Sequence, residues 1–229
     1  MISMPILGLG FLMGMRHALE ADHIAAVSTI AAGRTRMTDI VQHGLTWGLG
    51  HTLTLSSFAG VAIILGRTIP AVLAGHLEAA VGVMLVALGS NLLWQLWRDR
   101  IRLLHGLDVR HLHVGDGAAN GSTERPTKHG FRWRSLAVGL MHGMAGSAAL
   151  LVLTVSQVAD PLQGVVYIML FGLGSMIGMG ALSSVIAVPL MASARLLTGM
   201  NHGLQAAVGF LTIGIGATTI YTILIHANV

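Results

Sequence analysis

The sequence predicts an all-α integral membrane protein whose six transmembrane helices form two inverted three-helix repeats. Of its 229 residues, 54% are apolar and only 10% are Asp, Glu, Lys or Arg, whereas soluble domains contain about 25% charged residues. Six apolar stretches are long enough to cross a bilayer, and three short motifs recur in both halves of the chain. This composition, which includes no Cys, excludes a disordered chain, a disulfide-stapled secreted domain and an ordinary cytosolic enzyme.

Each apolar stretch has at least the roughly 20 residues that cross about 30 Å of hydrocarbon. The six spans are expected at Met4–Ala32, Asp39–Leu65, Val72–Trp97, Ser135–Gln157, Leu162–Met191 and Leu204–His226. No basic residue precedes Arg16, so the first stretch lacks the charged start of a signal peptide and we expect it to be retained. The chain is thereby divided into a first repeat (1–97), a polar loop (98–134) and a second repeat (135–229).

The positive charge is concentrated in the polar loop 98–134. This loop carries eight of the 13 basic residues and four of the nine acidic residues, which accounts for the whole net charge of +4. The basicity therefore does not indicate a nucleic-acid partner, and the expected partner is the lipid bilayer. The loops after the odd-numbered spans contain eleven basic residues, and the remaining loops and tails contain only Arg67. The positive-inside rule then predicts a multi-pass inner-membrane protein with loop 98–134 in the cytoplasm and both termini outside.

Three motifs of the first half recur in the second half at offsets of 125, 124 and 127 residues. The pairs are GMRH ending at His17 and GLMH ending at His142, WGLG ending at Gly50 and FGLG ending at Gly174, and EAAVG ending at Gly82 and QAAVG ending at Gly209. A chance match of helices rich in Ala and Gly is the alternative. Because each unit would contain three spans, the second unit is predicted to be inverted, as in transporters whose site lies near the membrane midplane.

A cluster of ionisable residues lies in the middle of the first predicted span. Its members are Arg16, His17, Glu20, Asp22 and His23. An Arg or Asp at mid-membrane costs roughly 2.5–3.5 kcal/mol, so such a cluster needs partners or a function. We predict that Arg16 pairs with Glu20 or Asp22. A polar loop between two shorter helices is the alternative to a continuous span.

The chemistry of this cluster favours a metal ion. Two neutral imidazoles and one carboxylate suit a borderline first-row divalent ion such as Ni²⁺, Co²⁺ or Zn²⁺. A straight helix would place Asp22 about 140° and His23 about 240° from His17, so these three side chains could not meet at one point. Either the helix is broken there, or one residue orients a ligand through a hydrogen bond. His51, in the second span, is predicted at the same depth as His17, which favours it as a further nitrogen ligand.

These residues resemble the motifs of a known family. His17-x4-Asp22-His23 resembles the HX4DH hallmark of the nickel/cobalt transporter family, and Gly50-His51-Thr-Leu-Thr resembles its second motif. The larger members are drawn with eight spans and carry an acidic motif where this chain has HGMAGSAA after Met141. In both respects the chain is similar to the shorter urease- and hydrogenase-accessory-type branch. The resemblance implies Ni²⁺ or Co²⁺ permeation, with His17, Asp22, His23 and His51 as ligands.

Six residues are secondary candidates for the site or for its approach. They are Glu20, His142, Ser147, Ser175, His76 and Glu78. His142 is the repeat mate of His17 and could be a ligand, a gate or a packing residue. Ser147 and Ser175 occupy the positions of Asp22 and His51 in the second repeat, and His76 and Glu78 could form an entry site or cap a helix.

Four histidines in the polar loop have two interpretations. His105, His111, His113 and His129 could pass a metal ion to or from a cytoplasmic metallochaperone, or they could simply belong to a solvated loop.

The sequence therefore predicts a permease for Ni²⁺ and/or Co²⁺, working in the direction of uptake. We expect no resident cofactor and no enzymatic activity, and no nucleotide-binding motif is present to drive an ATP-dependent step. Ligand nitrogens must be unprotonated, so a proton gradient could couple to release of the ion. A divalent-metal efflux permease, an intramembrane metalloenzyme with Glu20 as its base and an accessory subunit of metalloenzyme maturation are the alternatives.

Overall fold

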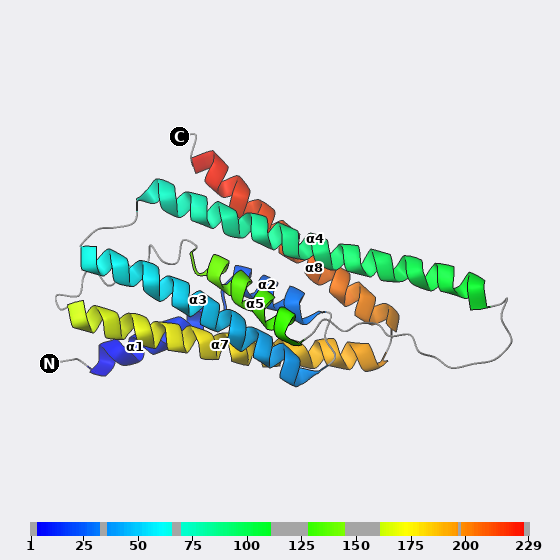
Figure 1. The fold of residues 1–229 in the computed structure, drawn as a ribbon, viewed down its shortest axis with the longest axis horizontal. Helices are drawn as coiled ribbons and strands as arrows, with labels where there is room; N and C mark the ends of the chain where they lie inside the picture. The colour runs from blue at the N-terminus through cyan, green and yellow to red at the C-terminus, as the bar shows by residue number, and fades with distance from the viewer. Residues whose placement is uncertain are drawn as a thin grey trace.

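The computed structural model describes residues 4–32, 36–65, 70–110, 128–144, 161–196 and 198–226. Every regular element within these ranges is an α-helix, which confirms the predicted all-α class (Figure 1). The helices are α1 (Met4–His17), α2 (Ala21–Ala31), α3 (Met37–Leu65), α4 (Ala71–Arg110), α5 (Lys128–His142), α7 (Pro161–Leu196) and α8 (Thr198–His226).

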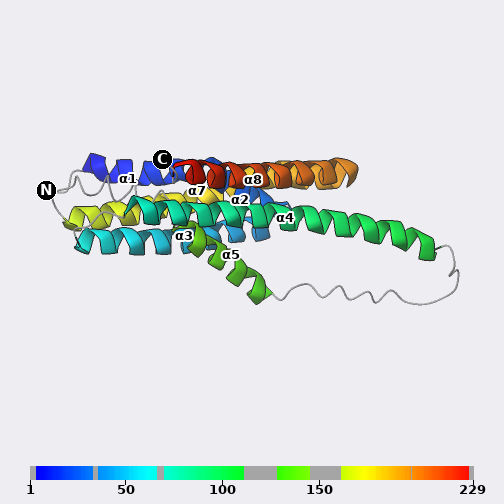
Figure 2. The same ribbon diagram turned by 90° about the horizontal axis from the view of Figure 1, so that it is seen from above.

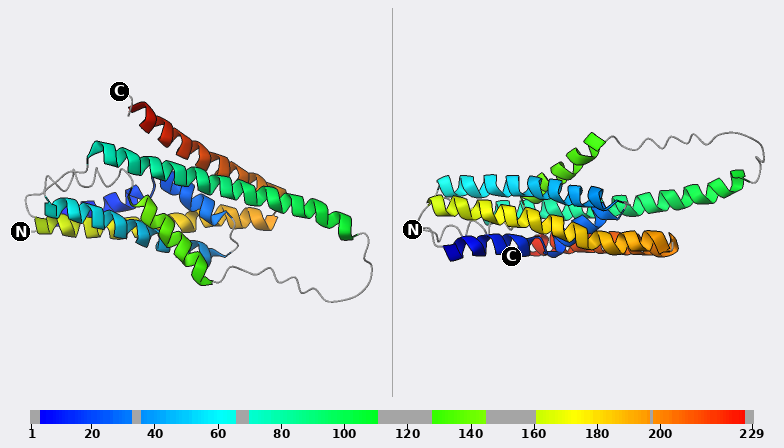
Figure 3. Two further views of the ribbon diagram at one scale, coloured as in Figure 1. Left: turned by 45° about the horizontal axis from the view of Figure 1, so that its top comes forward. Right: turned by 90° about the horizontal axis from the view of Figure 1, so that it is seen from below.

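The short helix α2 lies at the centre of an elongated bundle. Helix α1 packs on α7, α3 packs on both α5 and α7, and α4 packs on α8. Helix α2 contacts α3, α4, α7 and α8, and Figure 1 shows it with α5 between the α4–α8 pair and the other long helices. The colours of Figures 1 and 2 show that α1, α4 and α7 run in one direction and that α3, α5 and α8 run in the other. Helix α4 extends beyond the rest of the bundle at one end (Figure 3).

The surface of the bundle is apolar and part of its interior is polar. Large hydrophobic side chains such as Leu53, Val61 and Phe210 are more than half exposed. His51, His142, Ser175, Ser183 and Thr212 are completely buried. In the described part of the chain, three helical stretches are long and apolar enough to cross a membrane: Val72–Ile101, Leu162–Ala192 and Asn201–Ile225. This distribution fits a protein that is surrounded by lipid rather than by water.

Glycines bring the helix backbones into direct contact near the centre. A Cβ atom added at Gly14 of α1 would overlap the carbonyl group of Phe171 in α7. A Cβ atom added at Gly139 of α5 would likewise overlap the carbonyl group of Trp47 in α3. Such close approach is typical of small residues at interfaces between membrane helices. As a result, the end of α1 lies directly against α7 and the end of α5 lies directly against α3.

The first predicted span is not a continuous helix, which corrects the expectation for Met4–Ala32. The backbone N–H of Leu19 donates to the Arg16 carbonyl at 2.9 Å, and that of Glu20 donates to the His17 carbonyl at 3.1 Å. These tight turns end α1, as they do at many helix termini. Glu20 then has an extended backbone (φ −65°, ψ 151°) at the N-cap of α2. The break lies inside the ionisable cluster, so the alternative of two shorter helices is the correct one.

The polar loop 98–134 is helical at both ends, which is a second correction. Helix α4 continues to Arg110 and α5 already begins at Lys128, while residues 111–127 lie outside the described part. The physical reason is that residues 98–110 are rich in Arg and Leu, which favour helix. The Gly, Asn and Pro residues of the loop all follow His105. The fourth predicted span is described only as far as residue 144, with α5 ending at His142.

Candidate metal centre

Five ionisable side chains from four helices meet at the centre of the bundle. They are His17 at the end of α1, Asp22 and His23 in the first turn of α2, His51 in α3 and His142 at the end of α5. The four histidines are at most 5% exposed, and the Asp22 side chain is 28% exposed. All four ligands predicted from the motifs are thus brought together, and His142 joins them.

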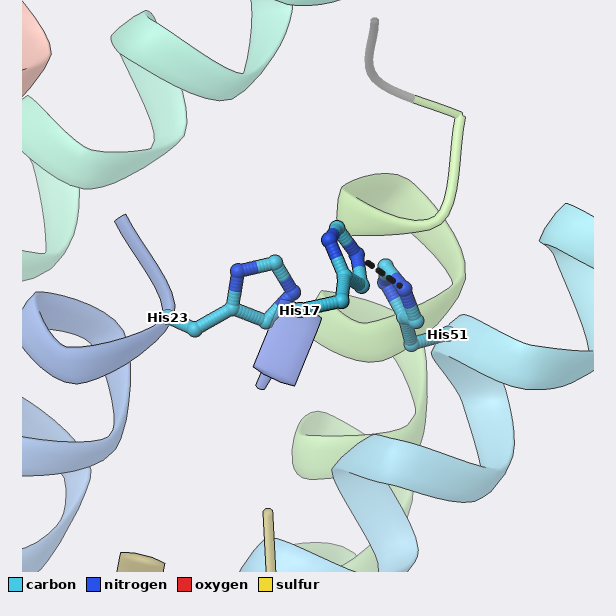
Figure 4. A group of neighbouring side chains, drawn as sticks. All are labelled: His17, His23 and His51. Atoms are coloured by element: carbon cyan, nitrogen blue, oxygen red, sulfur yellow. Dashed lines mark hydrogen bonds between the residues drawn. The ribbon is translucent and has the colours of Figure 1, made fainter. Parts of the chain in front are cut away.

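Three of the imidazoles form the first group of potential ligands. Nε2 of His17 lies 3.2 Å from Nε2 of His51. The ring centroid of His23 lies 4.5 Å from that of His17 and 5.1 Å from that of His51, and Figure 4 shows one of its ring nitrogens facing the other two side chains. One ligand atom from each of the three lies within 4.8 Å of the others. Because nitrogens bound to one ion at about 2.0–2.1 Å are roughly 3 Å apart, small side-chain movements would close this group around an ion.

Asp22 belongs to a second group, with His23 and His142. Oδ1 of Asp22 accepts hydrogen bonds from Nδ1 and from the backbone N–H of His23, both at 2.9 Å. Its Oδ2 accepts from Nε2 of His142 at 3.0 Å. The rings of His23 and His142 are in contact, with centroids 4.3 Å apart, and one ligand atom from each of these three residues also lies within 4.8 Å of the others. His23 is therefore common to both groups.

Carboxylates orient two of the histidines. Oε1 of Glu20 lies 2.9 Å from Nδ1 of His17, and Oδ1 of Asp22 holds Nδ1 of His23 at the same distance. A carboxylate that accepts from one imidazole nitrogen fixes the ring and leaves the other nitrogen as an electron-pair donor, as is common around metal ligands. The predicted pairing of Arg16 with Glu20 or Asp22 is wrong, because both carboxylates turn to histidines and the Arg16 side chain is exposed. The break between α1 and α2 makes this possible, since it lets Glu20 reach back to His17.

Two aromatic side chains form part of the wall of the centre. Trp47 is completely buried, and its ring centroid lies 5.4 Å from that of His23 and 5.2 Å from that of His142. The ring centroid of Phe171 lies 5.4 Å from that of His17. Sequence reasoning did not assign either ring to the site. The available signal was the repeated WGLG and FGLG motif, in which the two aromatic residues occupy matched positions.

The secondary candidates have different outcomes. Glu20 and His142 lie at the centre, and Ser175 is buried in α7, where its backbone packs against Gly14, one turn before His17. Ser147 lies outside the described residues. His76 and Glu78 are exposed near the start of α4, and Nδ1 of His76 bonds the Val72 carbonyl at 2.7 Å, so they do not join the cluster.

The histidines expected in the polar loop are only partly described. His105 and His129 fall within α4 and α5, and His111 and His113 lie outside the described residues.

Together, the apolar exterior and the buried cluster of histidines define a helical protein of membrane type with a candidate cation site at its core. The chain is 34% identical over 223 residues to the urease accessory protein UreH of Bacillus sp. (strain TB-90), which covers 96% of this chain and 92% of the relative. The chain therefore belongs to the family of the urease accessory protein UreH. This relation supports the expected urease-accessory-type branch.

Two plant proteins are more distant relatives. The chain is 25% identical over 219 and 220 residues to the chloroplast proteins FOR GROWTH AND FERTILITY 2 and 1 of Arabidopsis thaliana. These matches span 92% and 90% of this chain but only 55% and 56% of the plant proteins. No family model matches the chain, and no solved structure matches it either.

Proposed function

We propose that this protein is a membrane permease that moves Ni²⁺ and/or Co²⁺ across the inner membrane in the direction of uptake. The observation that carries the proposal is the contact of His17, His23 and His51 with one another and of His23 with Asp22, all inside an apolar bundle. Ionisable groups inside membrane proteins are costly and usually mark ion pathways. Imidazole nitrogens with one carboxylate, in a chain without Cys, suit these ions.

Membership of the family of a urease accessory protein agrees with this proposal. A permease that supplies a metal ion would be an accessory to an enzyme that needs one. On this view the ion is the cargo of the protein, and the centre must both bind it and release it. The rings of His51 and His142 suit such a transient site, since their Nδ1 atoms are buried without a hydrogen-bond partner among the described residues.

Glycine contacts support the proposed inverted repeats. A Cβ atom added at Gly82 would lie 2.9 Å from the Gly216 carbonyl oxygen, and one added at Gly89 would lie 2.7 Å from the Gly209 carbonyl oxygen. The motifs match Gly82 with Gly209 and Gly89 with Gly216. A two-fold rotation that exchanges the repeats would therefore exchange these two contacts.

The same rotation would relate the two ends of the candidate metal centre. The motifs match His17 with His142 and Phe171 with Trp47. His17 packs on Phe171 and His142 packs on Trp47, so these contacts also exchange. The cargo site would then lie between the two units, where a rocking motion of one unit against the other could expose it alternately to the two sides.

The proposed topology has six spans, with both termini outside and the loop 98–134 in the cytoplasm. Because the chain contains no Cys, single cysteines can report on it. We expect an impermeant maleimide added to intact spheroplasts to label Ser3→Cys and to leave Ser122→Cys unlabelled until the membrane is opened. The reverse pattern would show that the positive-inside assignment is wrong.

Transport itself is tested with the purified protein in proteoliposomes. We expect radioactive nickel to accumulate in vesicles that contain the native protein and to be displaced by excess Co²⁺. His17→Ala should reduce this flux at least about tenfold, because it removes one nitrogen of the first group of ligands. His76→Ala, which replaces an exposed histidine outside the cluster, is the matched control and should transport normally.

Three other outcomes decide between the alternatives. Flux that survives His17→Ala would mean that the cargo does not use this centre. If nickel only left vesicles that had been preloaded with it, and none accumulated in empty vesicles, efflux would be favoured. If the native protein moved no metal in either direction, the metalloenzyme or accessory-subunit alternative would replace the permease.

A further inference from the structure

We infer that the centre holds the transported ion at two adjacent positions that share His23, and that the ion passes from one to the other. The first position has the nitrogens of His17, His23 and His51, and the second has Asp22, His23 and His142. The inference rests on the proposed function, since it describes how the cargo moves within that site. It gives His142 a direct role as a ligand of the second position.

The two edges of the His23 ring define the two positions. Nδ1 of His23 is bonded to Asp22, on the side of the second group. Figure 4 shows the other nitrogen facing His17 and His51, and this Nε2 atom is buried without a hydrogen-bond partner among the residues described. One ring thus presents a nitrogen to each group of ligands.

A neutral imidazole has one electron-pair donor and one N–H at a time. When Nδ1 carries the proton and donates a hydrogen bond to Asp22, as the 2.9 Å contact allows, Nε2 can bind an ion in the first position. When the ion lies in the second position, Nδ1 must bind it and the proton must be on Nε2. A neutral His23 can therefore serve only one of the two positions at a time, which makes the two positions alternatives for a single ion.

Each position combines a ring whose Nδ1 atom is held by a carboxylate with a ring whose Nδ1 atom has no such partner. Glu20 fixes His17 through Nδ1, and Asp22 fixes His23. By contrast, the Nδ1 atoms of His51 and His142 have no hydrogen-bond partner in the described part of the chain. The rings of His51 and His142 belong to different helices, α3 and α5, and to different positions. Movement of either ring can therefore change one coordination group while the other stays in place.

The chemistry of the two positions differs in a way that suits transfer. The first offers only neutral nitrogens, whereas the second includes the carboxylate of Asp22, which neutralises part of the charge of a divalent ion. Two divalent ions on opposite sides of one imidazole ring would repel each other strongly among side chains that are this deeply buried. We therefore expect one ion per protein, which occupies the two positions in turn.

The test separates binding from transport in variants of His142. In His142→Gln, the side-chain amide can still donate a hydrogen bond to Asp22, but it is a poor metal ligand. We expect this variant to bind about one Ni²⁺ per protein in calorimetric titration, because the first position is intact, and to lose nickel flux by at least about tenfold. His17→Gln damages the first position and leaves the second one intact, so it should also bind about one Ni²⁺ per protein and lose flux.

Cobalt absorption supplies a readout that a purely structural role of His142 would not change. The bands of bound Co²⁺ report its ligand set, so a carboxylate contribution present in the native protein should be missing in His142→Gln. Unchanged bands, or native flux in that variant, would overturn the two-position arrangement. Loss of binding together with flux in His142→Gln, in a sample that remains monodisperse, would also overturn it in favour of a single five-ligand site.

The failure of this inference is distinguishable from failure of the proposed function. In the single-site outcome the native protein still transports nickel and the proposed function stands. If the native protein transports no nickel, both fail. His43→Ala provides a control for the loss of a buried histidine, because His43 contacts Ser135 and belongs to neither group of ligands.

Discussion

Replacing His23 by Ala is expected to abolish nickel transport and to remove most metal binding. His23 belongs to both groups of ligands, is 1% exposed, and contacts the rings of His17, His51 and His142. Loss of a residue that hydrogen-bonds to a metal ligand typically costs about 10–100-fold in affinity or activity. Loss of a ligand that is common to both groups should cost more. We therefore expect the flux of His23→Ala to fall to the level of empty vesicles.

This result must be separated from a general loss of structure. The variant leaves a cavity beside Trp47, so its thermal unfolding should be compared with that of His43→Ala, in which another buried histidine of the bundle is truncated. We expect the two variants to be destabilised to a similar extent and only His23→Ala to lose flux. If His23→Ala transported nickel at even a third of the native rate, the centre could not be the cargo site.

Replacing Asp22 by Asn is expected to reduce nickel flux by about 10–100-fold while the fold is retained. The carboxylate accepts hydrogen bonds from Nδ1 of His23 and Nε2 of His142, and hydrogen bonds to a charged group are worth roughly 1.5–3 kcal/mol each. Each 1.4 kcal/mol corresponds to about tenfold in binding. Asn has nearly the same shape, but it cannot neutralise the charge of the ion. Binding should therefore weaken along with transport.

Two comparisons make the effect of Asp22→Asn specific. Asp99→Asn removes a carboxylate from an exposed position on α4 and should leave the flux unchanged. The affinity for Ni²⁺, measured by calorimetry, should fall in Asp22→Asn and remain native in Asp99→Asn. An unchanged affinity in Asp22→Asn would show that the carboxylate neither binds the ion nor orients its ligands, and would remove it from the site.

The predicted ligands were accessible to sequence reasoning because their chemistry is unusual for their surroundings. Ionisable side chains in an apolar stretch are rare, so His17, Asp22 and His23 are conspicuous without any knowledge of the fold. His51 could be added because helix rise converts residue number into depth. Depth, however, does not show which way a side chain points. The sequence could therefore only weigh whether His142 is a ligand, a gate or a packing residue.

The break between α1 and α2 shows where helix periodicity is insufficient. Nothing in Ala18–Glu20 is a Gly or a Pro, so the local sequence contains no strong signal for a helix end. The break is accompanied by contacts between groups close to each other in space, namely Glu20 with His17 and Asp22 with His23 and His142. A straight helix could not direct His17, Asp22 and His23 to one point. The sequence therefore indicated either a broken helix or a residue that orients a ligand through a hydrogen bond. In the folded chain both options are realised, since the helix is broken and carboxylates orient histidines.

By itself, the sequence determined the all-α class, the apolar character of the surface and the four residues of the motifs, because composition, hydropathy and rare polar residues are local properties. Tertiary structure alone decided that His23 lies between two groups of ligands and that His142 completes the second group. It also decided that Trp47 and Phe171 pack against the histidines of the centre. These relations depend on how α2 is enclosed by helices that are far apart in the sequence. Close packing at Gly14 brings α1 onto α7, and close packing at Gly139 brings α5 onto α3. Such contacts form only when the helices meet.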